Sequence, residues 1–258
     1  MFFGKPKKKD SFGYGVFEEI DRTVSFNGTV IDGVERIEEN LLLDDLCVSG
    51  SAVFMGEVDA DKLVVYGSAE FREFATGDDV RIIGDSVFKN DLVCESLVVP
   101  GDAYILGVTS SDVVIVEGRM RANHKVKTIS LNVNGVLYCH DKLYADKILV
   151  KGAIESDSSI RCIDIRFTSE RRSVVRHSVK DKLFSVSRAA EPGEFVLCCD
   201  NAECGNANIE YAKIDYLRCE RCKIGRGCVI GKLECAGNAE IAPDAVVEEF
   251  ITVNPEVR

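Results

Sequence analysis

The chain has 258 residues, of which 46% are hydrophobic, and its formal net charge is −11 at pH 7. This composition is sufficient for a buried core, and the acidic balance argues against nucleic-acid binding, which needs a basic face. No apolar run approaches the roughly 18 to 20 residues that a bilayer crossing needs. We therefore expect a folded protein that neither spans a membrane nor binds nucleic acid.

Residues 1–18 are predicted to form a flexible tail ahead of the folded region. The opening "MFFGKPKKKD" places charges where a secretory signal would need its apolar stretch, which indicates a cytoplasmic protein. The eleven cysteines are then expected to be thiols, metal ligands or small core residues, because cytosolic redox buffers keep thiols reduced.

Residues 19–168 contain a repeat of seventeen residues that is marked by glycine. Eight glycines follow one another at this interval: Gly33, Gly50, Gly67, Gly84, Gly101, Gly118, Gly135 and Gly152. A β-branched residue stands two positions before each glycine, and further mostly apolar positions lie four before, four after and eight after it. A spacing of two is the period of a strand that faces inward at alternate residues. The pattern predicts an all-β fold, a β-helix with about 17 residues and three short strands per coil.

Equivalent residues of successive coils are expected to stack in columns about 4.8 Å apart. Phe54, Phe71 and Phe88 form one such column, which we interpret as core. We expect each repeat glycine to occupy a corner whose backbone conformation other residues resist.

A second column, six residues before each glycine, is mostly acidic. It holds Asp44, Asp61, Asp78, Glu95, Asp112 and Asp146. This acidic column has two interpretations: each carboxylate accepts a hydrogen bond from the backbone of its own turn, or the carboxylates form a cation-binding ladder.

The repeat stops near residue 168, and residues 169–197 form a basic insertion. From Arg166 to Arg188 the chain holds seven basic and two acidic residues. Val175, Val179 and Leu183 are spaced like a helical face, which predicts a helix here. The positive charge favours an anionic protein partner or a neighbouring polymer, and a solvated segment without a partner is the alternative.

Residues 198–251 return to coil-like spacing and are predicted to form three more coils, followed by a short tail at 252–258. Ile209, Ile224 and Ile241, for example, are separated by fifteen and seventeen residues. In this register the cysteines share columns with one another or with alanines: Cys204 with Cys219 and Cys235, and Cys222 with Ala207 and Ala239.

The spacing Cys199-x4-Cys204 and Cys219-x2-Cys222 also resembles a zinc ribbon. A zinc site needs four thiolates that converge on one ion, whereas a column distributes its residues along the axis of the helix. Buried cysteine also behaves as a small hydrophobic residue. We interpret these cysteines as core and predict no metal and no cofactor. A zinc site at the four residues and a redox pair are the alternatives.

The stretch "CKIGRGCVIGKLECAGNAEIAPDAVVEE" resembles the bactofilins, a family of polymer-forming cytoskeletal proteins. The resemblance lies in the alternation of glycine, alanine and apolar positions, and it implies a right-handed triangular β-helix, interrupted here by one insertion. It also implies a non-enzymatic scaffold that assembles into filaments without nucleotide. A second likeness is the opening "MFFGKPKKK", because many bactofilins begin with a short tail that attaches the filament to the inner face of the membrane.

Membrane attachment by this tail is physically reasonable. Two phenylalanines can enter the headgroup boundary while lysines face anionic lipid, each lysine contributing roughly 1 kcal/mol near the surface. The residues expected at the membrane are Phe2, Phe3, Lys5, Lys7, Lys8 and Lys9. We therefore expect a cytoplasmic protein that is peripheral at the inner face of the cell membrane. A disordered solubilising tail is the alternative.

Polymerisation also has a physical basis, because coil-like sequence runs from about Val24 to Ile251 and little remains to cap either end. An uncapped coil presents unpaired strand backbone, and a second copy of the chain can continue the ladder. The residues expected at the polymer interface are Ile241, Val247, Phe250 and Ile251. Pro255 and residues 12–22 as blunt caps are the alternative.

Two other functions compete with a filament. One is a β-helix binding scaffold, monomeric or oligomeric, that forms no filaments. The other is a hexapeptide-type acyltransferase, because residue–glycine pairs fall six apart between Ile224 and Gly237. Such enzymes use a histidine base and coils of eighteen residues, and none of the three histidines lies beside this run: His124, His140 and His177. We therefore predict that the protein is not an enzyme.

Overall fold

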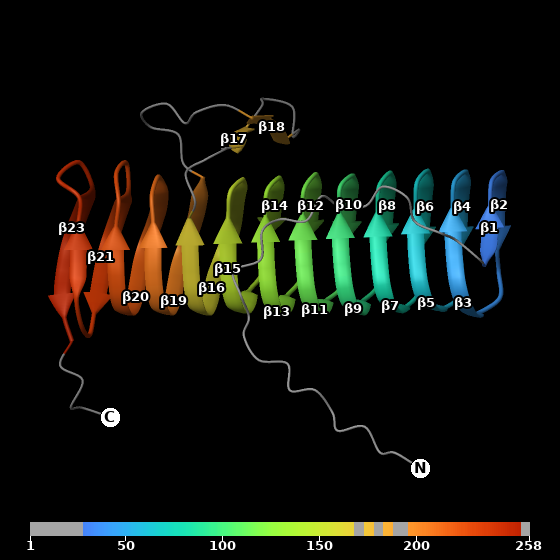
Figure 1. Ribbon diagram of the computed structural model, residues 1–258, viewed down its shortest axis with the longest axis horizontal. Coiled ribbons are helices and arrows are strands. Elements are labelled where there is room, and N and C mark those ends of the chain that lie inside the picture. The colour runs from blue at the N-terminus through green and yellow to red at the C-terminus, as the bar shows by residue number, and fades with distance from the viewer. Residues whose placement is uncertain (1–27, 168–172, 178–182, 188–195, 254–258) are drawn as a thin grey trace, which may run out of the picture.

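The computed structural model describes residues 28–167, 173–177, 183–187 and 196–253. These residues contain strands and no helix, and 21 of the strands form one continuous parallel ladder. Successive coils are stacked in one elongated row, with β1 at one end and β23 at the other (Figure 1). The fold is the parallel β-helix that the seventeen-residue repeat predicts.

Each coil of the repeat region contains one strand of eight residues and one of four. The eight-residue strands are β3 (Leu41–Val48), β5 (Val58–Val65), β7 (Ala75–Ile82), β9 (Leu92–Val99), β11 (Thr109–Val116), β13 (Val126–Val133) and β15 (Leu143–Val150). The four-residue strands are β2 (Val34–Ile37), β4 (Ser51–Phe54), β6 (Ser68–Phe71), β8 (Asp85–Phe88), β10 (Asp102–Ile105), β12 (Arg119–Ala122) and β14 (Val136–Cys139). The short strand β1 (Thr29–Ile31) belongs to the first described coil.

Strands of neighbouring coils pair in a register of seventeen residues, as in Thr29 with Leu46 and Val150 with Phe167. In each eight-residue strand the pairing skips the acidic column: Leu43 pairs with Ala60 and Asp45 with Lys62, but Asp44 pairs with no residue in this ladder. The chain therefore turns at the acidic column without interrupting the strand. Two of the three predicted strands of a coil are joined in this way.

The last coils have longer or less regular strands. They are β16 (Ala153–Phe167), β19 (Leu197–Ile209), β20 (Ala212–Ile224), β21 (Val229–Cys235), β22 (Ala239–Ile241) and β23 (Val246–Thr252). β16 pairs directly with β19, so that Ile154 lies beside Leu197 and the β-helix continues across the insertion. The register then changes from fifteen residues between β19 and β20 to seventeen between β21 and β23.

The helix predicted in the insertion is wrong. β17 (Ser173–His177) and β18 (Leu183–Ser187) are antiparallel strands that pair with each other outside the row of coils (Figure 1). Val175 lies on β17 and Leu183 on β18, whereas Val179 lies outside the described residues. Three residues at a spacing of four were weak evidence for a helix. The adjacent valines of "SVVRH" favour a strand, where β-branched side chains fit well.

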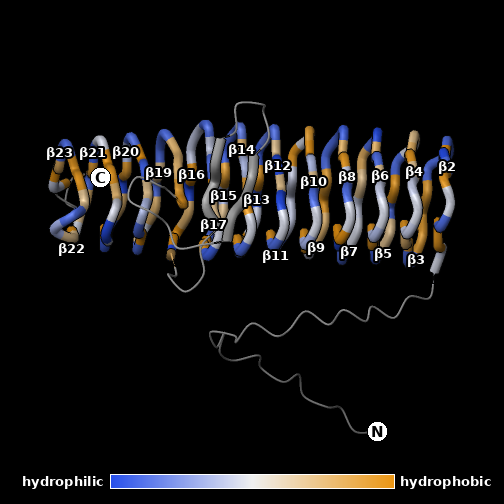
Figure 2. The backbone as a smooth tube through the Cα atoms, turned by 90° about the horizontal axis from the view of Figure 1, so that it is seen from above, coloured by the Kyte–Doolittle hydropathy of each residue, from blue (hydrophilic) through white to orange (hydrophobic). Residues whose placement is uncertain are grey.

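The core consists of the predicted columns, and hydrophobic and hydrophilic segments alternate around the coils along the whole row (Figure 2). The rings of Phe54 and Phe71 stack with centroids 4.8 Å apart, and those of Phe71 and Phe88 with centroids 4.5 Å apart. This phenylalanine column runs through twelve positions: Ile37, Phe54, Phe71, Phe88, Ile105, Ala122, Cys139, Ser156, Cys199, Ile214, Ile230 and Val247. The interpretation of the three phenylalanines as core is therefore confirmed.

The repeat glycines are required for a different reason from the one expected. Among the described glycines, only Gly227 has a left-handed backbone, with φ of 66°. A Cβ atom on Gly67 would lie closer than 3.0 Å to the carbonyl oxygen of Gly50, and the same clash recurs at each repeat glycine from Gly50 to Gly152. At Gly33, in the first described coil, a Cβ atom would have no neighbour within 4 Å. Glycine is needed because the corners of successive coils approach too closely for a side chain.

Candidate functional site

The first candidate site is the pair of end coils, whose outer sides are unpaired among the described residues. At one end β1 pairs only with β3 and β2 only with β4. At the other end β22 pairs only with β20 and β23 only with β21. Each end coil therefore presents strand backbone groups that a further coil can pair with.

Most of the partly buried apolar side chains that pack against the described core lie at these two ends. Ile37, Leu41 and Leu43 lie at the β1 end, and Ala239, Ala245 and Val247 at the β23 end. Side chains in the same columns further inside are fully buried, as Phe54 is beneath Ile37. The end coils thus expose apolar cross-section that the inner coils cover.

Three of the four residues predicted at the polymer interface occupy inward columns of the last coil. Ile241 follows Ile224, Val247 follows Ile230 and Phe250 follows Leu233, and these three partners are buried. Ile251 differs, because it follows Glu234, whose side chain bonds Tyr216 and Lys232 at the surface. Val246, which is 51% exposed, is an apolar residue of this coil that the sequence pattern did not single out.

Both end coils are acidic. Residues 28–40 contain four acidic side chains and one basic one, and residues 239–253 contain four acidic side chains and no basic one. Glu35 also enters the inward column of Ala52 and Ala69 at the β1 end. An inward charge on an edge strand opposes further pairing unless the charge is screened or matched.

The second candidate site is a column of cysteines, which we call the thiol column. Four consecutive coils contribute Cys162, Cys204, Cys219 and Cys235 to it. The column that was predicted for the last three is confirmed. Cys162 was missed because the insertion lengthens its separation from Cys204 to 42 residues and hides the interval.

The four cysteines with zinc-ribbon spacing do not share one column. Cys199 lies in the phenylalanine column between Ser156 and Ile214, whereas Cys204 and Cys219 lie in the thiol column. Cys222 lies in a third column, between Ala207 and Ala239. The cysteines that do converge are a different set. The Sγ atoms of Cys219, Cys222 and Cys235 lie within 4.8 Å of one another, and all three side chains are buried.

Hydrogen bonds among these thiols shift their acidities in opposite directions. The hydrogen bond with Cys219 lowers the pKa of Cys222, because it stabilises the thiolate of Cys222. The same interaction, together with burial, raises the pKa of Cys219. The Sγ atoms of Cys222 and Cys235 form a thiol–thiol contact of 3.9 Å. Among the described residues, this group is the one set of three or more potential metal ligands that converge.

The acidic column lies on the surface, where its members Asp44 to Asp146 are exposed. Two other positions of the same column hold exposed isoleucines: Ile129, between Asp112 and Asp146, and Ile163, which follows Asp146. No three carboxylates of this column converge in the described part of the chain. The column supplies the turn in each eight-residue strand, and its geometry gives no support to a multidentate cation site.

A surface ladder of aromatic and charged residues was not predicted. Tyr104, Arg121 and Tyr138 follow one another at intervals of seventeen, and the Arg121 guanidinium lies 5.8 Å and 5.7 Å from the two ring centroids. All three residues lie three positions after a repeat glycine, and this shared position was the sequence signal that could have predicted the ladder. Burial and the hydrogen bond to Asp157 raise the pKa of Tyr138.

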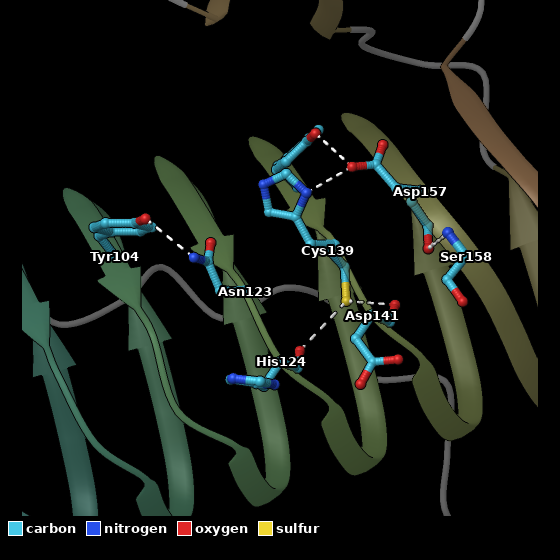
Figure 3. Close-up of polar contacts among 10 residues, drawn as sticks. Tyr104, Asn123, His124, Cys139, Asp141, Asp157 and Ser158 are labelled. Carbon is cyan, nitrogen blue, oxygen red and sulfur yellow. Dashed lines mark hydrogen bonds and ion pairs between the residues drawn. The ribbon is translucent and has the colours of Figure 1, made fainter.

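Polar contacts extend this ladder on both sides (Figure 3). Asn123 donates to the hydroxyl of Tyr104 at 3.2 Å. Asp157 accepts from the hydroxyl of Tyr138 at 2.7 Å and lies 2.6 Å from Nδ1 of His140. These contacts tie neighbouring coils together at an exposed face. The described histidines near the ladder, His124 and His140, belong to the repeat coils and not to the glycine-rich run from Ile224 to Gly237.

Two predicted sites fall where side chains are not described. The residues that the sequence predicts to bind a membrane, Phe2 to Lys9, lie outside the described residues. The insertion is described only as the backbone of β17 and β18, so its basic surface stays a prediction.

The fold defines the chain as a β-solenoid protein with about seventeen residues per coil. No protein-family model, curated protein or solved structure matches the chain. In the part of the chain that the structure describes, no helix is long and apolar enough to cross a membrane.

Proposed function

We propose that the protein is a non-enzymatic, bactofilin-like scaffold that lengthens by stacking its open ends on further copies of itself. The observation that carries the proposal is that both end coils leave strand backbone and apolar columns uncovered among the described residues. A second copy of the chain matches such an end in strand spacing and in column chemistry, because the columns of one chain continue those of the next. Nucleotide has no role in this kind of contact.

The acidic end coils make assembly dependent on ionic strength. Carboxylates on two stacked ends repel, and added salt shortens the range of that repulsion from about 30 Å at 0.01 M to about 8 Å at 0.15 M. We therefore expect filaments in nucleotide-free buffer at physiological ionic strength and fewer or shorter filaments at low ionic strength. Negative-stain electron microscopy and sedimentation measure both.

A matched pair of variants tests the contact itself. Phe250→Asp places a charge in an inward column of the last coil, where Phe250 is 48% exposed, and is expected to abolish assembly. Ile163→Asp places the same charge at a 60% exposed position on the flank of an inner coil and is expected to leave assembly intact. Equal filament formation by the two variants, with both folded by circular dichroism, would contradict stacking through this end.

Membrane attachment through the N-terminal tail is the second part of the proposal. Its basis is the sequence "MFFGKPKKK", in which two phenylalanines adjoin four lysines. Deletion of residues 1–9 should abolish co-sedimentation with vesicles that contain anionic lipid and should leave filament formation unchanged. Binding of the shortened protein at the level of the full chain would remove the tail from the proposal.

A binding scaffold that forms no filaments is the alternative function. The inward position of Glu35 and the like charges of the two end coils favour it, because both features oppose stacking. Monodisperse single molecules across a range of salt and protein concentration would decide for this alternative.

A further inference from the structure

Three buried thiols of the C-terminal coils converge from two different columns. Cys219 and Cys235 are neighbours in the thiol column on β20 and β21, and Cys222 belongs to the adjacent column. All three Sγ atoms lie within 4.8 Å of one another. We propose that these three thiols form a binding site for one thiophilic d10 cation of the Cu(I) or Zn²⁺ class.

Core packing alone explains only part of this arrangement. Stacking places Cys219 and Cys235 about one strand spacing apart, roughly 4.8 Å. It does not explain Cys222, because alanines occupy the positions before and after it in its own column. The side-chain space in that column is therefore filled by the methyl group of an alanine, and packing does not require a sulfur at Cys222. The Cys222 sulfur instead lies 3.9 Å from the Cys235 sulfur across the column boundary, closer than one strand spacing.

The sulfur positions match what such a cation requires. With metal–sulfur bonds of about 2.3 Å, the sulfurs of a three-coordinate site lie about 4.0 Å apart. The contact between Cys222 and Cys235 already has this length, and the other two pairs need to close by less than about 1 Å. Cation binding requires no rearrangement of the backbone.

Thiolate ligands also select the class of cation. Soft d10 cations prefer sulfur, whereas Mg²⁺ and Ca²⁺ prefer oxygen. Binding replaces the three thiol protons, which pass to solvent, by one cation, so the site carries a net charge of −2 with Cu(I) and −1 with Zn²⁺. A bound cation would link β20 to β21, one coil before the β23 end.

The test uses full-length protein that has been reduced and stripped of metal. It is titrated separately with Cu(I) under anaerobic conditions and with Zn²⁺, each against a competing chromophoric chelator, and metal per chain is then measured by elemental analysis. We expect one tightly held equivalent of at least one of the two cations. Because the loss of outer-shell partners alone weakens metal sites by about 10 to 100-fold, Cys222→Ala should weaken binding by about a hundredfold or more.

The control variant is Cys94→Ala. Cys94 is buried in the same column as Cys219, four coils before the first cysteine pair of that column, and its own column neighbours are Gly77 and Ser111 and not cysteines. This variant should bind the cation as the wild type does. Bound cation should also raise the thermal unfolding midpoint of the wild type and of Cys94→Ala, and should not raise that of Cys222→Ala.

Three results would overturn the site. One is wild-type protein that retains no more metal than Cys222→Ala, and another is equal loss of binding in Cys94→Ala. The third result comes from the wild type alone, so this test does not depend on whether a variant folds. In partial denaturant, bound cation should slow alkylation of Cys219, Cys222 and Cys235 relative to alkylation of Cys94. Equal alkylation rates with and without cation would contradict the proposal.

Discussion

The repeat region and the C-terminal coils are two versions of the same stacked coil. In the repeat region every coil has seventeen residues, a corner glycine and a common register. In the C-terminal coils the register varies from fifteen to seventeen, and the inward columns nevertheless continue, from Cys139 and Ser156 through Cys199 to Ile214. This difference shows that the fold depends on continuous inward columns, whereas the number of residues per coil can change from fifteen to seventeen without breaking them.

The largest expected effect tests whether the two regions share one column. Phe71 and Ile214 both lie in the phenylalanine column, and both are buried. Phe71→Ala should lower the free energy of unfolding by about 3 to 5 kcal/mol, and Ile214→Ala by about 2 to 5 kcal/mol. Ring stacking adds about 0.5 to 1.5 kcal/mol to the Phe71 value. Chemical denaturation of both variants measures the difference. A negligible loss for Ile214→Ala would show that the C-terminal coils are loosely packed.

The next effect tests the glycine corners, which belong to the repeat region alone. A Cβ atom on Gly84 would collide with the backbone of Gly67 and Tyr66, so Gly84→Ala should destabilise the protein by about 1 to 3 kcal/mol. Gly33→Ala is the matched control, because the same corner in the first described coil has open space around it. Equal thermal midpoints for the two variants would refute close approach as the reason for glycine.

Alkaline pH should weaken the repeat region through its buried thiols. Burial raises the pKa of Cys139 to about 12 from an ordinary value of 9.0. The folded state therefore favours the neutral thiol, so this contribution is complete below pH 9 and is lost as pH rises from 9 towards 12. The free energy of unfolding should fall as pH rises from about 9 to about 10.5, and it should fall less in Cys139→Ala, whose column neighbour Ala122 shows that alanine fits. Parallel pH profiles for the two proteins would contradict this assignment.

The smallest effect is expected where the two regions meet. Val150 pairs with Phe167, and Leu197 pairs with Ile154, so a regular coil would place two residues between Phe167 and Val196. Replacing residues 168–195 by the Lys-Gly pair found at Lys151 and Gly152 should keep the strand content and leave the thermal midpoint within a few degrees of the wild-type value. Two separate unfolding transitions would mean that the insertion joins two independent domains.

The fold was predictable because the same residue types return at a fixed interval. Phe54, Phe71 and Phe88 are seventeen residues apart, and Ile224 and Ile241 keep that interval in the C-terminal coils. Where the interval is lost, prediction failed. Cys162 and Cys204 are neighbours in space but 42 residues apart in sequence, so the full thiol column was not recognised.

The convergence of Cys222 on Cys235 was not predictable for a different reason. A repeat interval reports which residues share a column, but the direction of a side chain near a corner depends on the local turn. The same limit applies to the repeat glycines, whose clash partner is a carbonyl oxygen of the preceding coil. Columns follow from sequence spacing, whereas contacts between columns require coordinates.

The axial repeat of the assembled protein tests the central claim most directly. If the coils of one chain continue those of the next, then the twelve column positions of the described residues, at about 4.8 Å each, give a subunit repeat of about 58 Å along the filament. Electron cryomicroscopy of filaments formed at physiological ionic strength should show this repeat, together with a 4.8 Å layer line along the filament axis. Filaments whose coils stack across the axis, or particles that stay single at every ionic strength, would contradict growth through the open ends.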